Sequence, residues 1–408
     1  MTIFNKTKNA LKQTKLFYGF WSRFRREQLL RGYRQRREYY FELIERTGLK
    51  YSEKQVEIEV RERLVNRGYS PAKKTIGKIH TFAFIPDIGW HNHLLPDLEI
   101  LGPVTRFDYK SLGFNWEEFI KADNNAVLRR RQMNQHALSK LIESHNKRKV
   151  DWVFVYASGL EISVSTIKRI TDELGIPVVN MCLDDKHSWA GPLMGDHRAG
   201  QVDIAASFDI SWTSSRVACE WYIVEGARPV YMPEGFNIDV FKPMDVEQDI
   251  PVSFVGNAYG FRTSVIKYLK KYKIPVQTFG KGWPGSKWVD NIASIFNRSQ
   301  INIGMGGIGY SEALTNVKGR DFEIPATGGG LYLTSFNADL AQHFNIGNEI
   351  ICYSSRDELI ELVRYYLKHS DEAAKIAGNA HRRSIREHRW LHRYIKICNI
   401  LGILNENS

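Results

Sequence analysis

Short apolar runs alternate with helical patterns over much of the chain. The first run, Ile79 to Ile85, is followed by a series of similar runs with helical segments between them: VTRFDY, DWVFVYA, PVVNMCLDD, FDISWTS and PVYMP. Apolar strands separated by helices are typical of a parallel sheet whose two faces are both covered by helices. The pattern therefore predicts a doubly wound α/β domain over residues 76–240.

A second series of the same kind begins near residue 249. Its strands are DIPVSFV, VQTFG, INIGMG, GGLYLTS and EIICYSS, and three helical segments close the chain. This series predicts a second Rossmann-like domain over residues 241–408, with the join between the domains in residues 235–248. Open α/β sheets bind ligands at the carboxyl ends of their strands, so we expect two such ends to face each other across a cleft.

Residues 1–75 have a different character. Phe17, Phe20, Trp21 and Phe24 fall on one face of a helix, and further helical stretches are expected at 31–46 and 53–67. This segment has 19 Lys and Arg against 8 Glu, or +11 of the chain's +12, so the rest is almost neutral. A basic helix with an aromatic face indicates docking on an anionic membrane, and a packed helical extension is the alternative. Nucleic acid is a less favoured partner because the charge is confined to this segment.

Cysteine spacing and hydropathy limit the location of the protein. The four cysteines lie far apart and match neither a zinc site nor a disulfide framework, which is typical of a reducing compartment. No secretory signal is recognisable, and no apolar stretch approaches 18 residues. We therefore expect a cytoplasmic protein with no metal site, peripheral on the inner face of the membrane if residues 1–75 bind lipid.

Two segments resemble a known family. MPEGFNIDVFKP looks like the interdomain signature of GT-B glycosyltransferases, and KGRDFEIPATGGGLYLTS with the helices after it resembles the group-1-like members related to the spore maturation protein CgeB. The resemblance is strong over residues 205–395, looser over 79–204 and absent from 1–75. It implies a metal-independent enzyme whose C-terminal domain binds a nucleotide diphosphate sugar as co-substrate, with no other cofactor. It also implies that the closing helix of the chain crosses back to the first domain. The acceptor bound by the N-terminal domain would be a glycan, a lipid-linked group or a protein.

The donor site implied by the resemblance centres on Glu323, which matches the residue that holds the nucleotide ribose in the family. Lys318 and Arg320, near the start of the same helix, have the charge needed to neutralise a diphosphate. Close backbone approach, phosphate contacts and base contacts are expected from the remaining donor residues: Gly256, Asn257, Arg262, Gly282, Trp283, Asn316, Gly328 and Gly329. Two alternatives stay open. Arg320 and Glu323 are spaced to pair on an exposed helix face, and Trp283 is equally suited to core packing.

The chain departs from the broader group at one point. Many retaining relatives have Glu-x7-Glu, but here Thr315 stands where the first Glu is expected, with Glu312 and Asn316 nearby. The residue that contacts the donor sugar therefore stays undefined.

On the acceptor side, Asp87 and His91 are the predicted catalytic residues. They come with Trp90 and His93 in a loop expected after the first strand, where either side chain would orient or deprotonate an acceptor hydroxyl. Asp184 and Asp185, with His187 close by, form a second polar cluster. Paired carboxylates beside a histidine are compatible with a metal site or an acid/base pair, and the alternative is that they cap the next helix or lie solvated in a loop. Two other functions remain compatible with the sequence: an inactive GT-B-shaped scaffold at the membrane surface, and a nucleotide-sugar epimerase of the same fold.

Overall fold

The computed structural model describes residues 15–86, 89–115, 125–195, 197–285 and 289–405, and the chain divides into two compact units. Unit 1 combines the described residues before Tyr39 with Ile238–Glu387, and unit 2 combines Tyr39–Asn237 with the described residues from His388 onward. The chain therefore passes from unit 2 to unit 1 between Asn237 and Ile238, inside the segment where the sequence places the join.

Unit 2 is built on a six-stranded parallel sheet with the order β2-β1-β3-β4-β7-β8. Its strands are β1 Thr81–Phe84, β2 Val104–Arg106, β3 Trp152–Val155, β4 Val178–Cys182, β7 Ile210–Thr213 and β8 Pro229–Tyr231. A two-stranded hairpin, β5 Leu193–Met194 with β6 His197–Arg198, lies outside this sheet. The helices of this unit are α3 Glu53–Asn66, α4 His91–Leu101, α6 Ala126–Lys147, α7 Val164–Lys168, α8 Asp185–Ser188, α9 Arg216–Val224 and α15 Trp390–Ile400.

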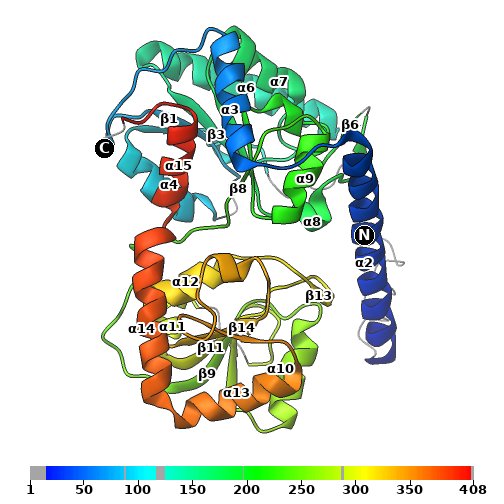
Figure 1. The fold of residues 1–408 in the computed structure, drawn as a ribbon, viewed down its shortest axis with the longest axis vertical. Helices are drawn as coiled ribbons and strands as arrows, with labels where there is room; N and C mark the ends of the chain where they lie inside the picture. Colours follow the sequence, from blue (N-terminus) through cyan, green and yellow to red (C-terminus); the bar gives the residue numbers. More distant parts are fainter. Residues whose placement is uncertain (1–14, 87–88, 116–124, 196, 286–288, 406–408) are drawn as a thin grey trace. The chain divides into compact units, whose positions relative to one another are not determined.

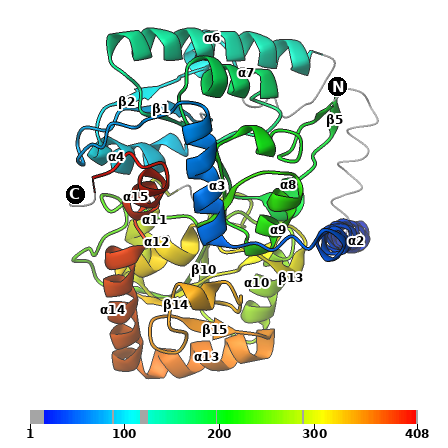
Figure 2. The same ribbon diagram turned by 45° about the horizontal axis from the view of Figure 1, so that its top comes forward.

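Successive residues of the central strands point to two different hydrophobic cores. On β3, Trp152 and Phe154 join a cluster with α3, α4 and α15, whereas Val153 and Val155 join a cluster with α6 and α7. The two helix groups lie on opposite faces of the sheet (Figure 2). Because side chains alternate along a strand, a strand that is apolar throughout is covered on both faces, as the sequence predicts.

Helix α4 corrects the prediction of a loop after the first strand. Its residues Leu94, Leu98 and Leu101 are buried at helical spacing, so the apolar face holds the segment against the sheet. Pro96 lies inside the helix and has no N–H to donate to the carbonyl of Asn92. That carbonyl accepts a hydrogen bond from Asn237 Nδ2 instead, at 3.2 Å.

The terminal helices α3 and α15 are integral to unit 2. Val56, Val60 and Leu64 of α3 are buried in the same core as the sheet, so part of the predicted N-terminal extension belongs to this domain. The last helix is predicted to return to the first domain, and in the structure α15 belongs to unit 2, which contains that domain. The Arg389 guanidinium at its start pairs with Asp97 of α4 at 2.9 Å.

Unit 1 has a five-stranded parallel sheet with the order β10-β9-β11-β14-β15. The strands are β9 Ile250–Val255, β10 Val276–Phe279, β11 Ser299–Ile303, β14 Leu331–Ser335 and β15 Ile351–Tyr353. A hairpin of β12 Gly307–Ile308 and β13 Ser311–Thr315 follows β11. The helices α10 Arg262–Lys271, α11 Ile292–Arg298, α12 Arg320–Thr327, α13 Arg356–Lys368 and α14 Ser370–Glu387 surround the sheet (Figure 1).

The N-terminal segment contains one long helix, α2 Lys15–Thr47, in place of the two shorter ones predicted. Phe20 and Phe24 are exposed on it, while Leu29 and Tyr33 are half-buried and Tyr40 is buried. At 3.6 residues per turn, the exposed pair lies about half a turn around the helix from the packed residues. Trp21 is half-buried beside Phe24, and the side chain of Phe17 is outside those described.

Candidate functional site

Three predicted donor-binding cations meet at the carboxyl end of the unit 1 sheet. Arg262 is the first residue of α10, which follows β9, and Lys318 and Arg320 lie at the start of α12. Together with the backbone of residues 304–306 after β11, they line a cavity of about 40 Å³. This volume is close to that of one water molecule, so only part of a phosphate group would enter it.

Arg262 is a cation that no carboxylate neutralises within the described part of the chain. Its guanidinium lies 4.7 Å from the ring centre of Tyr259 and 5.9 Å from that of Phe254. Nη1 donates only a long hydrogen bond, 3.5 Å, to the carbonyl of Asn257. Burial lowers the pKa of Arg262, but a guanidinium remains charged at neutral pH. A half-buried positive charge of this kind favours binding of an anion.

A buried acid that the sequence analysis missed organises the start of α12. The backbone N–H of Lys318 donates to Asp321 Oδ2 at 2.7 Å, and the Tyr332 hydroxyl donates to Oδ1 at 2.6 Å. Burial raises the pKa of Asp321. Lys318 itself donates from Nζ to the carbonyl of Gly307 at 3.1 Å. An acid in the first turn is a usual signal of a helix start, so the sequence could have placed Asp321 at the start of the helix. Its hydrogen bond with Tyr332 could not be predicted in this way.

Arg320 and Glu323 form an ion pair within the first turn of α12. The pairing is the alternative raised by their spacing, but the setting differs from an exposed helix face, because the Glu323 side chain is only 11% exposed. The Arg320 guanidinium also lies 5.6 Å from the ring centre of Phe296. A nucleotide ribose would therefore have to compete with Arg320 for the Glu323 carboxylate.

The glycines after α12 make close contacts with the protein itself. Gly328 ends the helix in the left-handed conformation, with φ of 63°, and a Cβ there would lie 3.1 Å from His381. A Cβ on Gly329 would lie 2.5 Å from the Cα of Asn297. These glycines were expected to allow close approach of a nucleotide, whereas in the structure they allow a helix end to pack tightly on α14 and α11.

Two predicted loops at the same edge of the sheet are bonded to each other. The N–H of Gly256 donates to Phe279 O at 2.8 Å, and the N–H of Lys281, just before Gly282, donates to Asn257 Oδ1 at 3.1 Å. Trp283 donates from Nε1 to Gly256 O at 2.7 Å and packs edge-on against Phe254. Only 8% of Trp283 is exposed. The Trp283 ring thus takes the core-packing arrangement.

The three residues at and near the position of the missing first Glu, Glu312, Thr315 and Asn316, lie on β13 or directly after it, but they have different partners. Glu312 on β13 pairs with Arg356 of α13. Thr315 ends β13 and is half-buried, while Asn316 is buried and donates its N–H to Gly306 O at 3.0 Å. Of the three, Asn316 is the one bonded to the backbone that lines the cavity.

In unit 2, the structure gives positions for part of the predicted acceptor site. Asp87 lies outside the described residues. His91 is the first residue of α4 and is half-buried. Trp90, just before it, packs edge-on against Tyr156 and Trp390, with ring centres 5.7 and 6.4 Å away. His91 therefore lies at the carboxyl side of β1, anchored by this aromatic cluster.

The two aspartates after β4 differ sharply in environment. Asp185 is buried and accepts hydrogen bonds from the hydroxyls of Thr213 and Tyr222, the latter at 2.9 Å. Burial raises its pKa to about 6. Asp184 is exposed and lies at the N-cap of α8, where it faces His187 at 3.8 Å. Asp185 thus has a structural role and Asp184 a position at a helix end.

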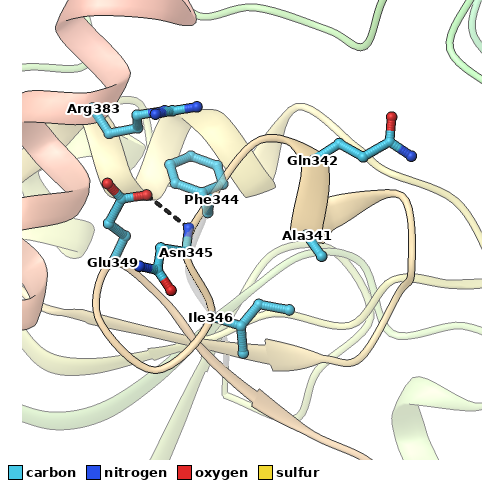
Figure 3. Close-up of a pocket in the computed structure, with 7 residues that line it drawn as sticks. All are labelled: Ala341, Gln342, Phe344, Asn345, Ile346, Glu349 and Arg383. Carbon is cyan, nitrogen blue, oxygen red and sulfur yellow. Dashed lines mark hydrogen bonds between the residues drawn. The ribbon is translucent and has the colours of Figure 1, made fainter.

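A larger hollow in unit 1 lies elsewhere, beside the loop of residues 341–349 and α14. Its volume is about 380 Å³, and Figure 3 shows Arg383 and Glu349 at the left of the view and Gln342 at the right. Glu349 accepts from the N–H of Asn345 at 2.8 Å, and Arg383 pairs with Glu387 at 2.8 Å. None of the predicted donor residues lines this hollow.

Comparisons with known proteins bear on the second half of the chain and on the fold. Residues 262–399 match the model of a family described as glycosyl transferase-like. HepE from Anabaena, in complex with UDP and glucose, is similar in structure with a TM-score of 0.51 and 11% identity, over 79% of this chain and 100% of that one. The UDP-forming α,α-trehalose-phosphate synthase from Burkholderia vietnamiensis is similar in structure with a TM-score of 0.50 and 11% identity, over 80% of this chain and 98% of that one. No curated protein matches at the sequence level.

The structural matches concern the fold, and the family match concerns residues 262–399. The chain has the α/β architecture of these two proteins, which confirms the fold class predicted from the sequence. The glycosyl transferase-like match covers α10 to α15, including the three cavity cations, and supports the predicted function of glycosyl transfer from a nucleotide sugar. Within the described residues, no helix is long and apolar enough to span a bilayer.

Proposed function

We propose that unit 1 binds the diphosphate of a nucleotide sugar at the cavity lined by Arg262, Lys318 and Arg320, and that the protein transfers the sugar to an acceptor bound by unit 2. The observation that carries this proposal is the half-buried guanidinium of Arg262, which no described carboxylate neutralises. Diphosphate oxygens would supply the missing negative charge.

The same groups account for the chemistry of the transfer. When the bond between the anomeric carbon and the diphosphate breaks, negative charge develops on the leaving oxygen. Fixed cations and the N-terminus of α12 stabilise that charge because they are already in place. Arg262 and Lys318 thereby do what a bound metal does in other transferases, and we propose that activity needs no metal ion.

For the acceptor, we propose His91 or Asp87 as the group that orients or deprotonates the attacking hydroxyl. Both follow β1, where ligands of open α/β sheets bind. The acceptor class is a cell-surface glycan, a lipid-linked group or a protein. We also propose that the chain is related to the group-1-like enzymes similar to CgeB, on the strength of the KGRDFEIPATGGG segment.

Titration with nucleoside diphosphates tests the donor site directly. Full-length protein should bind at least one of UDP, GDP, ADP, CDP and dTDP, and should release it from the matching nucleotide sugar when an acceptor is supplied. Binding without release in the presence of acceptor extracts would favour the scaffold function. A changed sugar without any acceptor would favour an epimerase.

We further propose that α2 holds the protein on an anionic membrane. The exposed Phe20 and Phe24 lie on the side of the helix away from its packed residues, and the surrounding segment is strongly basic. Aromatic insertion and charge attraction together give the two signals that stable attachment needs. Deletion of residues 1–74 is a poor test, because it removes the buried face of α3 from the core.

A further inference from the structure

Tyr259 is an exposed aromatic residue beside the cation of the proposed donor site. It follows β9 by four residues, and its side chain is 44% exposed. The ring centre lies 4.7 Å from the guanidinium carbon of Arg262, which lines the cavity. No other ring or cation contact of Tyr259 is found among the residues that the structure describes.

The loop that carries Tyr259 is fixed by main-chain hydrogen bonds. The N–H of Ala258 donates to Lys281 O at 2.9 Å, and the N–H of Tyr259 donates to Asn257 O at 3.1 Å. The ring is thus held in place before any ligand arrives, and its stacking on Arg262 limits its rotation further. An aromatic group that is already ordered costs little conformational entropy when a ligand stacks on it.

Trp283, which the resemblance related to the nucleotide base, has its polar atom and its ring engaged within the protein. Its Nε1 donates to Gly256 O, its ring packs against Phe254, and only 8% of it is exposed. Tyr259 therefore offers what Trp283 lacks, an accessible aromatic face at the same edge of the sheet.

We propose that Tyr259 is a positioning residue that stacks on the base of the donor nucleotide while Arg262 binds its diphosphate. This inference rests on the proposed function. A base at van der Waals distance from the free face would lie about 8 Å from the Arg262 guanidinium, a gap that the ribose and α-phosphate of an extended nucleotide bridge. Because every base has an aromatic face, the contact adds affinity without selecting one nucleoside.

Isothermal titration of the full-length protein with two ligands tests the proposal. The ligands are inorganic pyrophosphate and whichever of UDP, GDP, ADP, CDP and dTDP binds the wild type most tightly. Tyr259→Ala should weaken nucleotide binding roughly 5- to 150-fold and leave pyrophosphate binding unchanged. Tyr259→Phe should keep wild-type affinity for both. Tyr365→Ala is the matched control, since Tyr365 is also 44% exposed in unit 1 but stacks on His369 and not on Arg262.

Three outcomes would overturn the proposal. Unchanged nucleotide affinity in Tyr259→Ala would show that the base does not use this ring. An equal loss for nucleotide and pyrophosphate would show that Tyr259 only supports Arg262. If the wild type binds none of the five nucleotides, the proposed donor site itself fails, and that result is distinct because it appears before any substitution is made.

Discussion

Replacing Arg262 with alanine should weaken nucleoside diphosphate binding more than most single changes in unit 1. The guanidinium lines the cavity and has no described carboxylate partner, so its truncation removes a full positive charge without leaving an opposite charge unpaired. Hydrogen bonds to charged groups contribute about 1.5 to 3 kcal/mol, which corresponds to roughly a 10- to 150-fold loss of affinity. The fold should survive, because the lost cation–π contact contributes only about 0.5 to 1 kcal/mol at such a site.

The assay is isothermal titration of wild type and variants, with the melting temperature measured in parallel. Arg262→Lys should give an intermediate affinity, since lysine keeps the charge but loses the planar fork. Arg364→Ala is the control, an exposed arginine of α13 whose Nη2 bonds the carbonyl of Tyr272. Wild-type affinity in Arg262→Ala, with an unchanged melting temperature, would refute the reasoning.

Four further predictions concern other parts of the chain. Glu323→Gln should lower nucleotide affinity roughly tenfold if the ribose displaces Arg320, and full affinity would leave Glu323 a purely structural role. His91→Ala should reduce turnover by about 10² to 10⁴ while donor affinity is kept; full turnover would exclude it as the base. The buried Glu161 has its pKa raised by burial to about 7, so the folded state loses stability as pH rises from its unfolded value near 4.5 to 7. Glu161→Gln should therefore gain about 3 kcal/mol over wild type at pH 8 and much less at pH 5, and equal gains at both would contradict this. Phe20→Ser with Phe24→Ser should reduce binding to anionic vesicles in low salt without affecting donor binding, and undiminished vesicle binding would favour the packed-extension interpretation.

The central strands were predictable from sequence because they are buried on both faces of each sheet. A continuous apolar run such as Ile79 to Ile85 needs no knowledge of its neighbours to be recognised. The two-domain organisation followed from the repetition of such runs. Helix α4 was not predicted because Gly89 and Pro96 are typical of loops. The helix is also only 11 residues long, so few leucines mark its buried face.

The N-terminal helix shows a different limit. Helix α2 continues through residues 25–30, which separate the two predicted stretches, and through Gly32, because a single glycine costs only about 1 kcal/mol in a helix. Packing of Tyr40, whose hydroxyl donates to Glu225 at 2.6 Å, fixes the far end of the helix. That contact joins residues distant in sequence and leaves no local pattern.

The candidate site was predictable as a set of charges but not as an arrangement. Lys318, Arg320 and Arg262 were found from the family resemblance, together with their positions after strands and near helix starts. What the sequence could not give is the pairing: Arg320 with Glu323, Asp321 with Tyr332, and Arg262 with an aromatic ring in place of an acid. These depend on which loops meet at one edge of the sheet.

A crystal structure of the full-length protein with its tightest-binding nucleoside diphosphate tests the central claim most directly. The account predicts phosphate oxygens within hydrogen-bond distance of the Arg262 guanidinium and of the backbone N–H groups at the start of α12. A nucleotide bound elsewhere, for example in the hollow beside Arg383 and Glu349, with Arg262 still stacked on Tyr259 and contacting no phosphate, would contradict it.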